Sequence, residues 1–145
     1  DLNWVQLLNA YTCTECGRCT SACPANITGK KLSPRKIMMD TRDRMEEVGK
    51  NMDANKGVFV PDNKTLLNDY ITPEELWACT SCNACVEECP VNISPLSIIM
   101  DMRRYLVMEQ SAAPMSLNAM MTNVENNGAP WQYSQQDRLN WKNEN

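Results

Sequence analysis

The chain has 145 residues, 43% of them hydrophobic, which is enough for one domain with a real core and excludes a disordered chain. Its 14 basic and 18 acidic residues give a net charge of -4 without a long basic run, so we expect no nucleic-acid partner. The absence of histidine excludes histidine-ligated haem and Cys/His zinc sites. We expect no transmembrane segment in this chain, because no run of eighteen apolar residues occurs.

Helix signals recur in chain order. The first predicted helix, residues 3–11, leads into the first group of cysteines. A serine followed by a proline begins the helices predicted over residues 33–48 and 94–110, because serine is a good N-cap and proline suits the first helical position. A capping-box pattern precedes the short helix predicted within residues 72–78. Only "GVFVP", residues 57–61, is strand-like, so the predicted fold class is mainly α.

All eight cysteines lie in two ladders of identical spacing, "CTECGRCTSACP" at residues 13–24 and "CTSCNACVEECP" at residues 79–90. Disulfides are the weaker reading, because the cysteines are bunched and the chain can build a core. Structural zinc is also weaker, since paired Cys-x-x-Cys knuckles leave no role for a third and fourth cysteine. Cys-x2-Cys-x2-Cys-x3-Cys-Pro is the spacing of bacterial ferredoxins with two clusters. The sequence therefore predicts two [4Fe–4S] clusters.

In this spacing the fourth cysteine of each ladder serves the other cluster. A tight loop over the first three cysteines can wrap three corners of a cubane, and the proline then turns the chain away. The predicted metal ligands are Cys13, Cys16, Cys19 and Cys89 for one cluster, and Cys79, Cys82, Cys85 and Cys23 for the other.

The duplication extends beyond the cysteines. "SPRKIMMDTR" from Ser33 matches "SPLSIIMDMR" from Ser94, and the first copy carries a five-residue insertion at 28–32. Ile27 and Ile93 each follow the last ladder cysteine by four residues. We expect both isoleucines to pack over the clusters and exclude water, although ordinary core packing would select the same residue type. The repeated unit is a short helix, a cluster loop and a longer helix.

Two further segments carry predictions. A basic patch near the first ladder either receives an acidic electron donor such as a flavoprotein or is a solvated helix start; it comprises Lys30, Lys31, Arg35 and Lys36. We divide the chain into a two-cluster helical ferredoxin domain, residues 1–110, and a C-terminal arm, residues 111–145. The stretch "NNGAPWQYSQQDRLNW" has turn residues and little helical pattern, so the arm either docks on a partner or is partly disordered.

These ladders and this repeat resemble the alpha-helical ferredoxin domain of succinate dehydrogenase and fumarate reductase iron–sulfur subunits, and of the C subunits of heterodisulfide reductase and anaerobic glycerol-3-phosphate dehydrogenase. The resemblance covers residues 4–109 and is greatest to the heterodisulfide reductase type, because both ladders are complete and no plant-type [2Fe–2S] spacing precedes them. "YTCTECGRCTSACPANITGKKLSPRKIMMDTRD" and "NNGAPWQ" also resemble bacterial membrane (Fe–S)-binding oxidoreductases, in which a haem b domain precedes this module and a cysteine-rich CCG-type domain follows it.

The resemblance implies an electron-transfer subunit or domain of a respiratory-chain oxidoreductase, without catalytic residues of its own. It would relay single electrons between a flavoprotein or CCG-type catalytic partner and a membrane cytochrome b-like haem or quinone partner, at the cytoplasmic, inner face of the cytoplasmic membrane. This sequence contains neither CCG-type sequence nor haem-binding helices. Because the chain opens at Asp1, we expect it to be an excised or processed piece, with any membrane domain before that residue.

Two other functions are compatible with bound metal. The alternative from a different class is a stand-alone iron–sulfur enzyme that binds substrate on one cluster as a Lewis acid. That role needs an iron without its protein ligand, and eight cysteines for eight positions argue against it. A purely structural metal scaffold is the third reading, which reversible reduction of bound iron would exclude.

Overall fold

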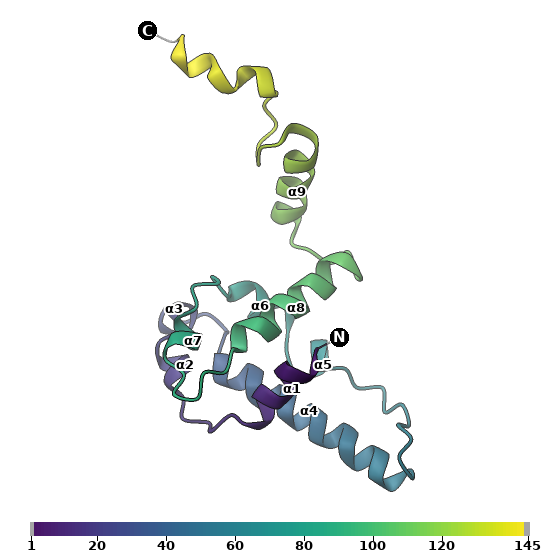
Figure 1. The fold of residues 1–145 in the computed structure, drawn as a ribbon. Coiled ribbons are helices and arrows are strands. Elements are labelled where there is room, and N and C mark those ends of the chain that lie inside the picture. The colour runs from purple at the N-terminus through teal and green to yellow at the C-terminus, as the bar shows by residue number, and fades with distance from the viewer. Residues whose placement is uncertain (1, 144–145) are drawn as a thin grey trace. The chain divides into compact units, whose positions relative to one another are not determined.

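The computed structural model describes residues 2–143, so residue 1 and residues 144–145, which the predicted domain limits include, lie outside the described part. The described chain is helical with no named strand, which confirms the predicted mainly α class (Figure 1). Its elements are α1 (Trp4–Tyr11), α2 (Arg18–Ser21), α3 (Pro24–Ile27), α4 (Pro34–Ala54), α5 (Leu66–Asp69), α6 (Pro73–Ala78), α7 (Ala84–Glu87), α8 (Pro95–Met108), α9 (Met115–Asn127) and the 3-10 helix η1 (Gln135–Lys142).

Side-chain caps begin α4, α6 and α8 where the sequence predicts them. At α4, the Ser33 hydroxyl accepts a hydrogen bond from the Lys36 backbone N–H. At α6, Thr72 and Glu75 form a reciprocal capping box, and the Glu75 carboxylate accepts from the Thr72 backbone N–H at 2.8 Å. At α8, the Ser94 hydroxyl accepts from the Ser97 backbone N–H at 3.2 Å. Each cap satisfies backbone donors that the first helical turn leaves free.

The core of the first unit lies where α4, α6 and α8 supply fully buried apolar side chains. These are Ile37 and Met38 on α4, Leu76 on α6, and Ile98 and Ile99 on α8, all with 0% exposure. The matched helices α4 and α8 thus bury matched residues, since Met38 corresponds to Ile99 in the repeat. α1 also packs against α4, so the helix that precedes the first ladder is anchored to the longest helix of the fold.

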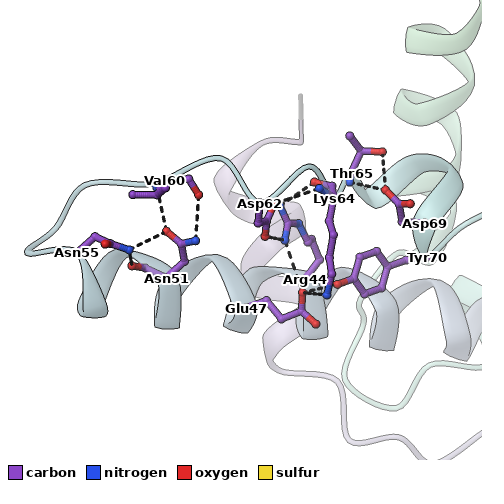
Figure 2. A network of polar contacts seen from close by, with 10 residues as sticks. All are labelled: Arg44, Glu47, Asn51, Asn55, Val60, Asp62, Lys64, Thr65, Asp69 and Tyr70. Carbon is purple, nitrogen blue, oxygen red and sulfur yellow. Dashed lines mark hydrogen bonds and ion pairs between the residues drawn. The ribbon is translucent and has the colours of Figure 1, made fainter.

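The segment between α4 and α6 returns along α4 and is held there by polar side chains (Figure 2). Arg44 forms a two-pronged ion pair with Asp62, at 2.5 Å and 2.8 Å, and also donates to the Lys64 carbonyl at 2.8 Å. Glu47 accepts from the Tyr70 hydroxyl and pairs with Lys64 at 3.3 Å. Arginine–carboxylate forks of this kind have a defined geometry, so the network sets the path of the returning segment.

This network accounts for two differences from the predicted elements. α4 continues to Ala54 instead of ending near residue 48, because the returning segment supports its last turns. The strand predicted at residues 57–61 was wrong. Val60 makes its backbone hydrogen bonds with the Asn51 side chain, 2.9 Å in each direction, and the described chain offers it no neighbouring strand.

The chain divides into two compact units, one up to Tyr105 and the other from Leu106. In the second unit, α9 ends at Asn127, and the capping residue Gly128 lies in the left-handed region (φ 64), as glycine after a helix often does. The Arg138 guanidinium donates to the carbonyls of Asn127 and Gly128, which ties η1 to the end of α9. The helical turns of η1 were not expected from the sequence. None of the helices described over residues 2–143 combines the length and the apolar character needed to cross a membrane.

Candidate metal centres

The two cysteine ladders adopt the same backbone course. Glu15 and Ser81 occupy matched positions and both lie in the left-handed region, at φ 57 and 56. Gly17 and Asn83, also matched, lie there at φ 80 and 63 and begin α2 and α7. Gly and Asn tolerate this conformation better than most residues, which explains their presence two residues before the end of each tight loop. The duplication in sequence is therefore a duplication in loop structure.

A cavity lies beside the first loop and contains thiols from both ladders. Cys13, Cys16 and Cys19 line it together with Cys89, the last cysteine of the second ladder. The apolar side chains of Met38 and Ile93 also line it, as does Arg35. The space between these atoms is about 340 Å³, part of it open to solvent. The four thiols of the first predicted ligand set thus share one cavity.

A different group of cysteines lies around the second loop. Cys23 and Cys85 are both 7% exposed, and the helices that precede Cys23 and hold Cys85, α2 and α7, pack against each other. Burial raises the pKa of the Cys85 thiol to about 11, and the neighbouring thiolates Cys79, Cys19 and Cys23 add to that rise. Cys79 and Cys23 of the second predicted set therefore lie near Cys85, and so does Cys19 of the first set.

Cys82 is the most open member of the second set. It is exposed, and hydrogen bonds from the Ala84 backbone and the Thr80 side chain lower the pKa of its thiol. Cys19 differs, because burial raises the pKa of its thiol and Cys13 and Cys16 contribute to the rise. All eight cysteines are free thiols, and within residues 2–143 no three Cys, Asp or Glu side chains surround a point where a single metal ion could sit.

These residues fit the iron–sulfur clusters that the spacing predicts. Thiolates are the usual ligands of [4Fe–4S] clusters, and cluster sites are largely shielded from water. Metal ligation requires deprotonated sulfur. Because the pKa values of the Cys19 and Cys85 thiols are raised, cluster binding must release a proton from each of them. The Ser81 backbone N–H lies 3.4 Å from the Cys79 sulfur, an orientation that also stabilises a thiolate.

The two isoleucines matched by the repeat differ in environment. Ile93 is 5% exposed and lines the cavity of the first ligand set. Ile27, by contrast, is 68% exposed at the end of α3 and does not line that cavity. The polypeptide alone therefore does not bury Ile27. A role for either residue toward a cluster stays a prediction.

The basic patch is partly neutralised by acidic partners. Lys36 pairs with Asp40 at 2.7 Å and with the buried Glu75 at 2.9 Å, and it donates to the Tyr70 carbonyl at 2.8 Å. Lys31 pairs with the exposed Glu74 at 3.4 Å. Arg35 instead lines the cavity of the first ligand set. The patch thus contains one structural lysine and one cavity residue.

Two arginines near the loops were not singled out from the sequence. Arg42 pairs with Glu15 in the first loop, and Arg103 donates to the backbone around Cys79 in the second. The matched "DTR" and "DMR" in the repeat were the available signal, because they place both arginines at the same position after the helix start.

Comparison with known proteins identifies the domain type. The family model "4Fe-4S dicluster domain" matches residues 12–93, which include both ladders. The chain is 35% identical to "Probable iron-sulfur-binding oxidoreductase FadF" of Bacillus subtilis over 99% of this chain and 24% of the relative. It is 34% identical to "EtfAB:quinone oxidoreductase" of Syntrophomonas wolfei over 99% of this chain and 23% of the relative.

A third relative matches a shorter part of the chain. It is the C subunit of the ferredoxin/F(420)H(2)-dependent CoB-CoM heterodisulfide reductase of Methanosarcina acetivorans, 34% identical over 74% of this chain and 52% of the relative. The chain thus spans about a quarter of the two bacterial relatives and about half of this one.

Proposed function

This chain belongs to the 4Fe-4S dicluster domain family, and from that premise we propose that it is the electron-relay module of a larger redox complex. It is an iron–sulfur domain of the kind found in oxidoreductase subunits, and it binds two [4Fe–4S] clusters. When bound, such clusters supply one-electron chemistry without a change in covalent substrate bonds. The chain's own residues hold the clusters, shield them from water and orient charge around them.

The ligand sets are those expected from the spacing, with the last cysteine of each ladder crossing to the other loop. The observation that carries this assignment is the shared cavity of Cys13, Cys16, Cys19 and Cys89. The packing of α2 against α7, which brings Cys23 near Cys85, supports the reciprocal crossing. Crossed ligation ties residues 13–24 to residues 79–90, so the two clusters are neighbours.

Paired serine substitutions test the crossing. Under crossed ligation, Cys16→Ser with Cys89→Ser removes two ligands of one cluster, so about four iron per chain should remain. Cys16→Ser with Cys23→Ser removes one ligand from each cluster and should affect both. Uncrossed ligation predicts the opposite pattern. Iron, acid-labile sulfide and electron paramagnetic resonance after dithionite reduction of anaerobic samples distinguish the two arrangements.

The same preparations test the electron-relay role. The unsubstituted chain should contain about eight iron and eight sulfide, and its reduced spectrum should be broadened by coupling between neighbouring clusters. A spectrum from only one cluster in a fully folded chain would favour the alternative of a substrate-binding enzyme. Bound zinc with no signal after reduction would exclude electron transfer.

For partners, we propose a flavoprotein or CCG-type catalytic subunit on one side and a membrane cytochrome b-like haem or quinone partner on the other, at the inner face of the cytoplasmic membrane. The names of the S. wolfei and M. acetivorans relatives support such partners. Arg35 lies at the cavity of the first ligand set, where it can attract an acidic donor.

Stopped-flow reduction tests the flavoprotein partner. Reduction of this chain by reduced electron-transfer flavoprotein should saturate with flavoprotein concentration and slow as salt is added. Arg35→Gln should lower the association rate, whereas Lys50→Gln on the last turns of α4 is the matched control. A rate that neither saturates nor responds to salt would rule against this donor.

A further inference from the structure

Each cluster loop is contacted by an arginine from the long helix that follows it. Arg42 of α4 and Arg103 of α8 occupy matched positions in the repeat, and they reach Glu15 and Ser81, which are matched in the loops. Both loop residues lie in the left-handed region, so their side chains leave the loops in the same way. The duplicated fold has therefore kept one arginine contact per loop.

The two contacts differ in charge. The Arg42 guanidinium forms an ion pair with the Glu15 carboxylate at 2.6 Å, and the Asp43 carboxylate lies 3.9 Å away. Arg103 meets only neutral groups around its guanidinium: it donates to the Leu76 carbonyl at 2.6 Å and 2.9 Å, to the Cys79 carbonyl, and to the Ser81 hydroxyl at 3.4 Å. No carboxylate among residues 2–143 pairs with Arg103. Its positive charge is thus not balanced.

Further contacts fix the position of the Arg103 charge. The guanidinium lies 5.0 Å from the centre of the Trp77 ring, on the helix that delivers the chain to Cys79. Its neighbour in sequence, Arg104, turns away and pairs with Asp101 at 2.8 Å. Because the fork holds two carbonyls and stacks on an aromatic ring, Arg103 keeps one place beside the second loop.

We propose that Arg42 and Arg103 are positioning residues of the two cluster loops. The matched loop residue is Glu15 in the first copy and Ser81 in the second, and this difference gives the two clusters different reduction potentials. Reduction adds one negative charge to a cluster, which a nearby unbalanced cation stabilises. The Arg103 charge therefore raises the potential of the second cluster. The Glu15 carboxylate cancels the corresponding effect of Arg42 in the first loop.

This inference rests on the proposed electron-relay function and adds a direction to it. The arginine contacts favour the reduced state at the cluster held by Cys79, Cys82 and Cys85. Other charges near the loops, Arg18 and Arg35 at the first and Glu87 at the second, also shift the potentials. The test is therefore the change in each reduction potential when residue 15 or residue 81 is replaced by the residue found at the matched position.

Redox titration of the loaded chain tests the proposal, followed by electron paramagnetic resonance. Ser81→Glu should lower one midpoint potential, and Glu15→Ser should raise the other. We expect the equilibrium constant of reduction to change on the order of tenfold, or ~59 mV for a one-electron couple. Folding should survive both changes, because glutamate already occupies the matched left-handed position at residue 15.

Matched controls separate a local effect from a general change of charge. Asn63→Glu adds the same charge at another left-handed position, in the segment that returns along α4, and Asp53→Ser removes one from the exposed last turn of α4. Neither control should shift a midpoint potential as far as Ser81→Glu or Glu15→Ser does. Arg103→Lys should keep the second midpoint near its original value, whereas Arg103→Gln should lower it.

The outcomes distinguish this inference from the function beneath it. Opposite shifts of two different midpoints, each larger than in its control, support the proposal. With about eight iron per chain, unmoved midpoints or shifts of the same sign would overturn the proposal while leaving the electron-relay function intact. A chain that binds no iron–sulfur cluster would instead overturn the proposed function.

Discussion

Ile93 closes the cavity of the first ligand set with an apolar side chain. Ile93→Ala would leave a void beside the thiols, and such substitutions at buried sites cost about 2–5 kcal/mol of stability. We expect the clusters of this variant to be lost several times faster. The decay of visible absorbance in the presence of an iron chelator measures that rate.

The repeat offers its own control for Ile93. Ile27 occupies the matched position but is 68% exposed, so Ile27→Ala should alter stability by no more than about 0.5 kcal/mol. Equal rates of cluster loss in the two variants would contradict the assignment of a shielding role to Ile93 alone. They would show instead that Ile27 also covers a cluster in the loaded chain.

Tyr70 carries a pH-dependent contact with α4. Its hydroxyl donates to Glu47, and the hydrogen bond to this carboxylate raises the pKa of Tyr70. The same hydrogen bond lowers the pKa of Glu47, so the contact contributes its full stability between the ordinary glutamate pKa of 4.5 and pH ~10, the ordinary tyrosine pKa. It loses that stability as the pH rises through the higher folded value of Tyr70, and again as the pH falls through the lowered folded value of Glu47. Nuclear magnetic resonance titration of ring-labelled tyrosine should show Tyr70 ionising at lower pH in Glu47→Gln. An unchanged titration in that variant would exclude the contact.

Lys36 joins α4 to α6. Burial would raise the pKa of Glu75, but hydrogen bonds from Thr72 and Lys36 outweigh it and lower that pKa, so the carboxylate is ionised beside the lysine. Lys36→Met would leave this charge buried without its cation. Because Lys36 is itself partly exposed, we expect a loss of about 1–2 kcal/mol, between the values for exposed and buried pairs.

Hydrogen exchange locates the effect of Lys36→Met. The substitution should increase the exchange rates of the α6 amides more than those of the α8 amides. Lys31→Met is the matched control, because Lys31 pairs with the adjacent Glu74 while both side chains are exposed, at 62% and 71%. It should change exchange in α6 very little. If the two variants behave alike, Lys36 does not anchor α6.

At the scale of the whole chain, the cluster ligands and the C-terminal segment lie in different parts of the sequence. All eight cysteines and the matched family region lie before residue 94, and the first unit ends at Tyr105 within α8. A chain truncated after residue 110 keeps α8 complete. We therefore expect it to retain about eight iron and both midpoint potentials of the full chain. Anaerobic iron analysis and redox titration compare the two.

The second unit then has a role apart from the clusters. It carries exposed aromatic side chains, including Trp131 at 54% and Trp141 at 68%, which suit the predicted docking on a partner. Loss of either cluster on truncation would contradict the proposed division at residues 110 and 111. Full iron content with slower reduction by the flavoprotein would support it.

Features set by neighbours in sequence could be predicted. The cysteine spacing indicates two [4Fe–4S] clusters because one loop can present only three sulfurs to a cubane, and the family match agrees with two clusters. Helix starts at Ser33 and Thr72 were also predictable, since a cap acts on backbone groups within three residues of itself.

Features that depend on contacts between distant residues required the folded structure. α4 outlasts its predicted end because residues 60–64 return to it, and Val60 pairs with a side chain instead of a strand. Ile27 and Ile93 look equivalent in the repeat, yet α3 exposes one while the second ladder brings the other to the cavity. The balanced Arg42 and unbalanced Arg103 likewise become visible only when helix and loop are in contact. Local chemistry therefore specified the cofactor and the helix starts, whereas long-range packing specified which side chains surround the cofactor and with what charge.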